Sequence, residues 1–593
     1  MVHKFHIPVL GLGYSIDTPL KVAKYGISSV VSVVDDELIE RMRKYHSEQN
    51  GLAFIPIAKK DANSRSERIS SYLNLLEELV QAQFQALKTE EFTVGSDLCT
   101  YFDLLPNDSQ LKHGYELMME YPEGERKVIF QNILKKRMGI GSIDVNIMAK
   151  VDKQNFAKDD TYLGDEHTDA LAALRGFAQS KLNASVILSA GMNPKLYSYI
   201  SQFDDFFPNP AGEVKKRIIL KVSDFRSALI QAKFLAKKGI WVSEFRIESG
   251  LNCGGHAFAT EGYLLGPILQ EFKENKAFLI SELHTLYSDA LAARGIEGTV
   301  IPAQRISVQG GIGTSLENEF LLKHYQLDAT GWGSPFLLVP EVTNVDDKTL
   351  SKLVEAKEDD YYLSNSSPLG ILFNNFKGST IEQQRLSRIE KGRPGSPCTK
   401  KYLCTNTEFT EQPICTASRE YQNLKIKQLE TLELSEAEFE IKLNTITEKV
   451  CLCEGLCASV YLKDDILKPK ESDAVAICPG PNLAYFSNTY TLQEMVSHIY
   501  GNLDLLEKVK RPHFFIKELN LYIDYLQTEI QNHLKDFSDK KQKQLTKFKS
   551  QLLEGVGYYK NLFLSSESIH VFAKENPYVD LLSAEEKLAN TLI

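Results

Sequence analysis

The chain has 593 residues, with 68 basic and 78 acidic side chains and a net charge of −10. This charge is spread along the chain, which argues against nucleic acid as a partner, because phosphate binding needs a concentrated basic face. No apolar run approaches the roughly 20 residues of a membrane helix, and the N-terminus lacks the shape of a signal peptide. We therefore expect a cytoplasmic protein without membrane contact, long enough for a large domain and an appended unit.

The first part of the chain alternates short apolar segments with amphipathic ones. Apolar runs at 6–11, 28–34 and 52–57 predict buried strands, and helical spacing at 37–45 and 66–87 predicts helices. Between about 93 and 140 this alternation stops, which indicates an insertion with its own helices.

Strand–helix alternation then resumes. The predicted strands are 143–148, 185–188, 218–222, 241–248, 305–309 and 329–339. Parallel strands that are each followed by a helix allow either an open doubly wound sheet or a closed barrel.

Glycines follow the last two of these strands. Gly310, Gly311 and Gly313 come directly after 305–309, and Gly333 and Ser334 follow at the spacing of one helix. Glycines in such turns let backbone N–H groups approach an anion, and the next helix directs its positive N-terminus to the same place. Alone, Gly-Gly-Ile-Gly could equally be a tight turn. The pair of turns predicts a phosphate site of the kind found in many barrels.

The count of eight or nine strands and the late phosphate turns favour an α/β fold, a (β/α)₈ TIM barrel. We predict three parts: a barrel over 1–390 with the insertion at about 93–140, a cysteine-rich segment over 391–480, and an α-helical region over 481–593. The last two form an α-helical, cysteine-rich C-terminal extension.

Two segments carry a resemblance to a known family. VQGGIGTS, followed by DATGWGSPFLLVPE, resembles the FMN-phosphate segment of the nitronate monooxygenase (2-nitropropane dioxygenase) family. The segment 249–256, SGLNCGGH, resembles the G-x-x-A-G-G-H motif of that family and the S-G-G-H motif of the trans-acting enoyl reductases of polyunsaturated fatty-acid synthases. The resemblance covers roughly residues 5–345. Cys253 replaces the usual alanine or serine, so substrate identity does not transfer.

The resemblance implies roles for further residues. His256 would transfer a proton beside the flavin, at the carboxyl end of a strand, where barrel chemistry takes place; a loop-capping histidine is the alternative. Lys221 would place a cation near N1 of the flavin, with a surface lysine as its alternative. The other expected flavin contacts also lie at strand ends or in the glycine motif: Gly11, Gly13, Asn146, Gly254 and Gly255.

Seven of the nine cysteines lie between Cys398 and Cys478. Thiolates close in sequence ligate zinc or iron–sulfur clusters, but the spacings here do not match a zinc-ribbon pair. Three interpretations stay open: an iron–sulfur cluster, scattered structural thiols, or zinc. For a metal centre the predicted ligands are Cys398, Cys415, Cys451 and Cys453.

The sequence thus predicts an FMN-dependent oxidoreductase that resembles nitronate monooxygenase and acts on a small-molecule substrate. One alternative is an NAD(P)H-dependent enoyl-type reductase with a cysteine-bound iron–sulfur cluster. A protein electron donor would pass electrons to that cluster. The other is a non-catalytic, flavin-binding scaffold. No oligomeric state is predicted.

Overall fold

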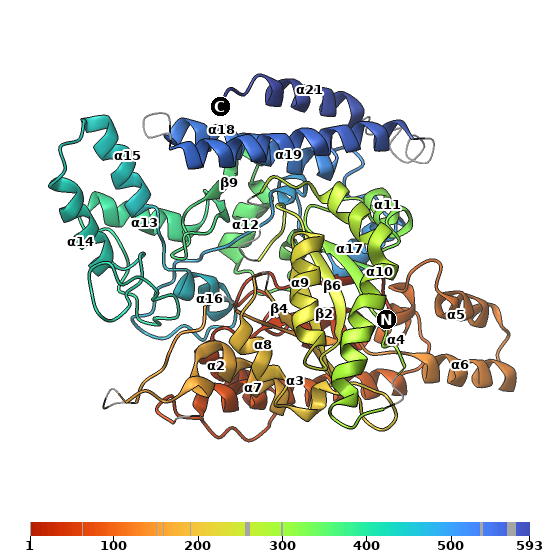
Figure 1. The fold of residues 1–593 in the computed structure, drawn as a ribbon. Helices are drawn as coiled ribbons and strands as arrows, with labels where there is room; N and C mark the ends of the chain where they lie inside the picture. The colour runs from red at the N-terminus through yellow and green to blue at the C-terminus, as the bar shows by residue number, and fades with distance from the viewer. Residues whose placement is uncertain are drawn as a thin grey trace.

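Eight parallel strands close into a barrel at the centre of the molecule (Figure 1). The computed structural model describes residues 2–61, 63–149, 151–157, 159, 161–189, 191–254, 261–297, 300–533, 538–565 and 577–593. The strands are β1 (Phe5–Ile7), β2 (Ser28–Ser32), β3 (Ile143–Ile147), β4 (Ala184–Leu188), β5 (Lys216–Val222), β6 (Val242–Glu248), β7 (Arg305–Gln309) and β8 (Ala329–Gly331). β8 pairs with β1, Phe5 opposite Thr330, which closes the barrel. The predicted TIM barrel is confirmed.

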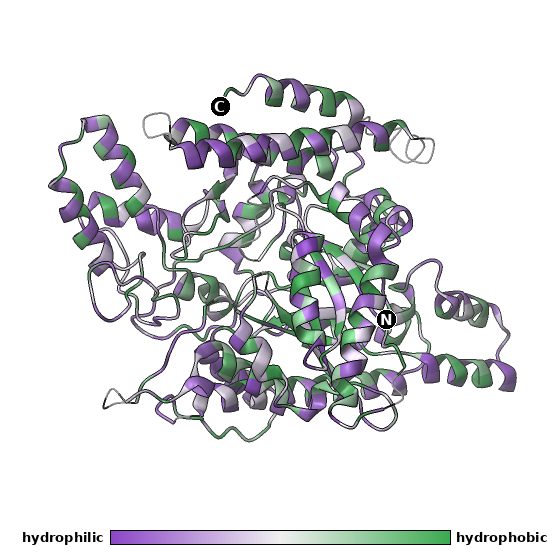
Figure 2. Ribbon diagram, in the orientation of Figure 1, coloured by the Kyte–Doolittle hydropathy of each residue, from purple (hydrophilic) through white to green (hydrophobic). Residues whose placement is uncertain are grey.

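Helices cover the outside of the barrel, whose strands are rich in buried apolar residues (Figure 2). The helices between strands are α1 (Thr18–Val22), α2 (Asp36–Gln49), α3 (Ser64–Thr89), α7 (Asp169–Gln179), α8 (Pro194–Ile200), α9 (Phe225–Ala236), α10 (Leu265–Ala292) and α11 (Ser315–His324). The region of the predicted insertion forms three helices that project to one side in Figure 1: α4 (Asp97–Asp103), α5 (Gln110–Glu120) and α6 (Glu125–Arg137).

The extension begins after β8 with helices and one hairpin. These are α12 (Asp347–Glu355), the antiparallel pair β9 (Tyr361–Ser364) and β10 (Phe373–Phe376), α13 (Thr380–Glu390), α14 (Arg419–Glu430), α15 (Glu436–Thr447), α16 (Leu452–Lys463) and α17 (Leu492–Ile499). Its last helices, α18 (Phe514–His533), α19 (Asp539–Leu564) and α21 (Pro577–Ala589), lie together along the top of Figure 1. α18 and α19 contact α10 of the barrel.

One predicted strand is wrong, and another is shorter than predicted. Residues 52–57 form a loop in which Ile55 is 78% exposed. Its backbone bonds to side chains instead of a strand, since the carbonyl of Ile55 accepts from Arg43 at 2.6 Å and the N–H of Ile57 donates to Glu40 at 2.8 Å. The expected strand 329–339 ends at Gly331, and the 3-10 helix η4 (Ser334–Leu338) follows, because Pro335 suits a first helical turn.

Within the part of the chain that the structure describes, no helix combines the length and the apolar character needed to cross a membrane.

Candidate active site at the barrel mouth

A cavity of about 140 Å³ lies at the carboxyl ends of the barrel strands. Side chains alternate between the inside and outside of each strand, and residues at or just after the ends of β1 to β6 line the cavity. The polar residues that line it in this way are Ser32, Asn146, Ser189, Lys221 and Glu248. The extension supplies an apolar wall of Leu369, Ile371, Phe373 and Leu456. Barrel and extension therefore build the cavity together.

Lys221 and Glu248 form the charged part of this site. Lys221 Nζ lies 3.1 Å from Glu248 Oε1, and the two side chains are 15% and 6% exposed. The same carboxylate oxygen accepts from Asn252 Nδ2 and Gln309 Nε2, both at 2.7 Å. These donors fix a charged carboxylate in a place with little water. Lys221 thus lies in the cavity and is not a surface lysine.

A second layer of charge lies below the cavity. Arg246 donates to Glu244 Oε1 at 2.8 Å, and Ser307 donates to the same atom at 2.6 Å. Burial alone would raise the pKa of Glu244, but Arg246 and Arg305 lower it to about 2. Burial, assisted by Arg246, lowers the pKa of His6 to about 3, so this histidine is neutral. Barrel interiors are usually filled by branched aliphatic residues; here Val30, Ile187 and Ile219 form only a small apolar cluster.

Four of the predicted flavin contacts line the cavity: Gly11, Asn146, Lys221 and Gly254. Gly254 has a φ of +80°, and a Cβ there would lie 2.0 Å from the carbonyl oxygen of Val9. Its N–H donates to the carbonyl of Cys478 at 3.2 Å. Only glycine can occupy this place between the end of β1 and the extension. Gly255 and His256 lie outside the described residues.

Gly13 contacts the extension. It lies beneath α16 and not in the cavity, and its N–H donates to the carbonyl of Leu456 at 2.9 Å. A Cβ at Gly13 would come within 2.9 Å of the Val460 side chain. This glycine lets α16 approach the end of β1.

The predicted phosphate turns are covered by protein. None of Gly310, Gly311, Gly313, Gly333 and Ser334 lines the cavity. Leu251 lies over Gly311, where a Cβ would come within 2.6 Å of the leucine side chain. Ser334 Oγ accepts the N–H of Gly480 from the extension at 2.8 Å.

The anion at the N-terminus of α11 is the carboxylate of Glu317. Its Oε2 accepts the N–H groups of Gly313 and Thr314 at 2.8 and 3.1 Å, and Oε1 accepts from Arg511 at 2.8 Å and from the N–H of Phe514 at 3.1 Å. Burial opposes ionisation, but Arg511 and these hydrogen bonds lower the pKa of Glu317. The positive end of the helix is therefore already satisfied by the chain.

The cavity suits the ring of FMN, but the glycine turns do not accommodate its phosphate. The cavity has an apolar wall and polar groups at one side, which suit a planar ring with a polar edge. The two glycine turns leave no room for a phosphate while Leu251 and Gly480 cover them. The sequence analysis predicted the glycines of the cavity but did not predict Glu248. The pattern that could have identified it is the charged residue at every second position of one strand, Glu244, Arg246 and Glu248.

Six of the seven cysteines between Cys398 and Cys478 belong to one apolar core or pack against it, and Cys457 lies in the main core. The shared core includes the four predicted ligands, Cys398, Cys415, Cys451 and Cys453, together with Cys478, and Cys404 packs against it. Among the residues that the structure describes, no group of three or more histidine, cysteine, aspartate or glutamate side chains is arranged to hold a metal ion. The structure therefore gives no support to the predicted metal centre, and the thiols pack as small apolar groups.

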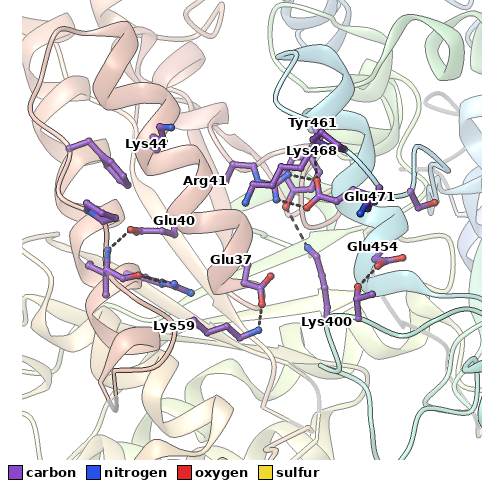
Figure 3. Close-up of a pocket in the computed structure, with 18 residues that line it drawn as sticks. Glu37, Glu40, Arg41, Lys44, Lys59, Lys400, Glu454, Tyr461, Lys468 and Glu471 are labelled. Atoms are coloured by element: carbon purple, nitrogen blue, oxygen red, sulfur yellow. Dashed lines mark hydrogen bonds and ion pairs between the residues drawn. The ribbon is translucent and has the colours of Figure 1, made fainter. Parts of the chain in front are cut away.

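A larger cleft of about 780 Å³ separates α2 from α16 (Figure 3). One ion pair between its lining residues crosses it: Arg41 from α2 bonds Glu471 from the extension at 2.7 and 2.8 Å. Lys59 pairs with Glu37 on the barrel side. Because these charges satisfy one another, we read this cleft as the seam between barrel and extension and not as a ligand site.

Comparison with known proteins gives structural neighbours only. No protein-family model matches the sequence, and no curated protein matches it. The structure is similar to a FabK mutant from Thermotoga maritima, with 10% identity, a TM-score of 0.30, and 67% of this chain and 83% of the other covered. It is similar to the enoyl reductase domain of MlnA from the macrolactin biosynthesis cluster of Bacillus amyloliquefaciens, with 13% identity, a TM-score of 0.29, and coverage of 75% and 88%.

A third neighbour is nitroalkane oxidase from Streptomyces ansochromogenes, with 10% identity, a TM-score of 0.28, and coverage of 78% and 97%. At such identities and TM-scores these likenesses support no conclusion about this chain, and the barrel is established by its own strand pairing.

Proposed function

We propose that this protein is an FMN-dependent oxidoreductase whose flavin ring binds in the barrel-mouth cavity. One observation supports the proposal above the others. The cavity brings together Gly11, Asn146, Lys221 and Gly254, which lie at four different strand ends and were each named from sequence as flavin contacts. Residues at the carboxyl ends of barrel strands meet at one face of the barrel, and here four of the positions that the resemblance assigns to the flavin line the same cavity.

The residues of this chain would bind and orient the ring. Lys221, held by Glu248, would place a fixed cation at the polar side of the cavity. Leu369, Ile371 and Phe373 would exclude water from the other side. The flavin, when bound, supplies the redox chemistry, and the protein supplies position and electrostatics. Within the proposal, His256 remains the proton-transfer residue.

The proposal has one structural requirement. For FMN to bind through the glycine turns, Leu251 and the segment around Gly480 must move away from Gly311 and Ser334. The N–H groups of Gly313 and Thr314 stay engaged by Glu317. The phosphate would then be held by the N–H groups of Gly311, Gly333 and Ser334.

The covered phosphate turns favour a second candidate function. A barrel that keeps the cavity but has filled the phosphate place with its own residues would be a scaffold without flavin chemistry. In that case the ion pair of Arg511 and Glu317 occupies the place of the predicted phosphate site and has a purely structural role.

Anaerobic absorbance spectroscopy separates the two candidates. An oxidoreductase would purify with flavin bands, and boiling would release FMN and not FAD. NADH, NADPH and a nitronate with oxygen are then added in turn, because bleaching by a nicotinamide indicates a reductase and turnover of the nitronate indicates a monooxygenase. A colourless protein that does not take up added FMN would support the scaffold.

A further inference from the structure

Two thiols of the extension lie close together at an open surface. Cys398 Sγ is 3.9 Å from Cys404 Sγ. Cys404 is half-buried, and together with Cys398 and Cys415 it lines an open cavity of about 600 Å³. The pair is therefore within reach of a small molecule, unlike the fully buried Cys457 and Cys478.

The backbone between these thiols is a tight loop with an unusual conformation. Cys398 has a φ of +54° and Lys401 a φ of +59°, and residues with a side chain seldom adopt this left-handed region. The sulfurs at the two ends of the loop 398–404 lie 3.9 Å apart, so that the two cysteines form its neck. The surrounding structure must hold this conformation in place.

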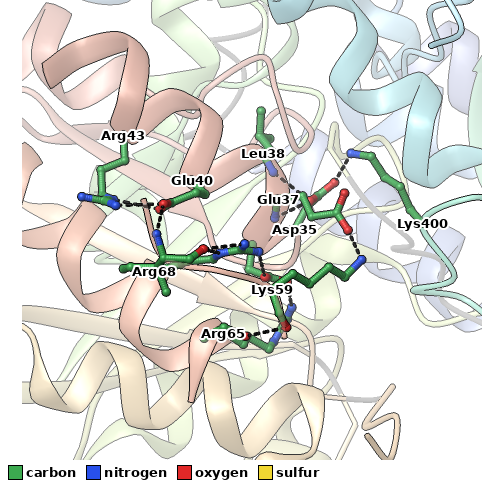
Figure 4. Close-up of polar contacts among 12 residues, drawn as sticks. Asp35, Glu37, Leu38, Glu40, Arg43, Lys59, Arg65, Arg68 and Lys400 are labelled. Atoms are coloured by element: carbon green, nitrogen blue, oxygen red, sulfur yellow. Dashed lines mark hydrogen bonds and ion pairs between the residues drawn. The ribbon is translucent and has the colours of Figure 1, made fainter. Parts of the chain in front are cut away.

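The tip of the loop holds the extension on the barrel. Lys400 forms an ion pair with Asp35, both side chains being buried, as Figure 4 shows. Tyr402 donates from its hydroxyl to Asp36 Oδ1 at 2.9 Å. Asp35 also caps α2 by accepting the N–H groups of Glu37 and Leu38 at 3.0 and 2.9 Å. The loop thus fastens on the two aspartates that begin α2.

The same loop reaches the candidate active site. Tyr402 and Leu403 line a small cavity together with Val34 and Met148. Val34 and Met148 also line the barrel-mouth cavity. A bond that restrains the neck of the loop would therefore also restrain residues that pack against Val34 and Met148 at the barrel mouth.

We propose that Cys398 and Cys404 are a redox-active thiol pair that a small-molecule disulfide oxidises to an intrachain disulfide, which locks the loop 399–403 on α2. The more exposed Cys404 attacks the reagent first, releases one thiol and forms a mixed disulfide. Cys398 then displaces the second thiol and forms the sulfur–sulfur bond. Two electrons pass from the cysteine sulfurs to the reagent, and both protons leave with the released thiols.

The geometry is suited to this bond. The sulfurs in a disulfide lie about 2.05 Å apart, so the two atoms need to approach by roughly 2 Å from their present places. Cys398 belongs to the apolar core that also contains Cys451, and the partly buried Cys404 packs against that core with its sulfur 3.9 Å from Cys398 Sγ. This proposal is independent of whether the cavity binds flavin.

Mass spectrometry of the full chain tests the pairing. The reduced protein is incubated with oxidised glutathione and digested with trypsin without reductant. Cleavage after Lys400 and Lys401 separates the peptides 392–400 and 402–419, so a disulfide at the neck joins them. The second peptide contains both Cys404 and Cys415. The variants Cys404→Ser and Cys415→Ser therefore decide which thiol reacts, and each serves as the control of the other.

We expect the joined peptides in the natural chain and in Cys415→Ser, and their loss in Cys404→Ser. Backbone hydrogen exchange over 399–403 should slow on oxidation in Cys415→Ser and stay unchanged in Cys404→Ser. Joined peptides that persist in Cys404→Ser and vanish in Cys415→Ser would overturn the proposal. So would glutathione that remains on the protein without joined peptides, or stoichiometric zinc or iron that protects the thiols and is lost in Cys398→Ser.

Discussion

Arg511 Nη1 lies 2.8 Å from Glu317 Oε1, and the two side chains are 5% and 0% exposed. This ion pair joins the extension to the helix that follows β7, at the place where the sequence predicted a bound phosphate. The extension therefore supplies part of the structure of the barrel's own turn.

Replacing Arg511 by methionine should lower the free energy of unfolding by about 3–5 kcal/mol, because it leaves the buried Glu317 carboxylate without its cation. Urea denaturation measures the change. The double variant Arg511→Met with Glu317→Gln should recover part of the loss, since no unpaired charge remains. An unfolding midpoint in Arg511→Met equal to that of the natural chain would show that the pair contributes nothing.

Gly13 and Gly557 offer a matched test of how α16 packs. A Cβ at Gly13 would overlap Val460 and the carbonyl of Leu456, whereas a Cβ at Gly557 in α19 meets nothing within 4 Å. Gly13→Ala should destabilise the protein by about 1–3 kcal/mol through overpacking. Gly557→Ala should stabilise it by about 0.5–1 kcal/mol, because alanine favours the helix. Equal effects of the two changes would argue against the described contact of α16 with the end of β1.

Two buried histidines should make the protein less stable in mild acid. Burial lowers the pKa of His3 to about 4 and that of His6 to about 3, whereas an unfolded histidine has a pKa of about 6.5. Below that value the unfolded chain binds more protons than the folded one, so stability falls as the pH decreases toward the folded pKa values. Each histidine should cost on the order of 2 kcal/mol between pH 6.5 and 5.

Urea midpoints at pH 7 and pH 5 measure this loss. Burial raises the pKa of Glu518 and Asp144, which acts in the opposite direction. Comparison with His3→Asn removes that contribution, because both carboxyl groups are present in each protein. We expect a smaller loss of stability between pH 7 and pH 5 in the variant. An identical loss would contradict the description of His3 as a buried histidine that stays neutral in the folded protein.

Lys221 provides a test of the cavity's electrostatics. Lys221→Met leaves Glu248 with its donors Asn252 and Gln309, so the fold should persist. If a flavin binds beside Lys221, loss of the cation should destabilise the anionic reduced form and lower its reduction potential. Spectroelectrochemistry measures the potential, and Lys221→Arg should restore most of it. A potential that does not change in Lys221→Met would place the flavin away from this residue.

Local sequence signals predicted the barrel well but not what covers its mouth. Strand 305–309 and its glycine turn follow from β-branched residues and Gly-Gly-Ile-Gly, which depend only on near neighbours. The run 52–57 has the composition of a strand, but its backbone bonds to the side chains of Arg43 and Glu40. Coverage of the phosphate turns by Gly480 and Arg511 joins positions more than 140 residues apart and leaves no local pattern. The same holds for the docking of Lys400 on Asp35.

Flavin binding to variants of the cavity wall tests the central claim most directly. Ile371 lines the cavity, and Ile371→Trp should fill it; Ile441→Trp makes the same chemical change on α15, at a position that is 61% exposed. Titration with FMN, followed by flavin fluorescence, compares both variants with the natural chain. We predict one FMN per chain in the natural protein and in Ile441→Trp, and none in Ile371→Trp. Equal binding by Ile371→Trp, or no binding by the natural chain, would contradict the assignment of the barrel mouth as a flavin site.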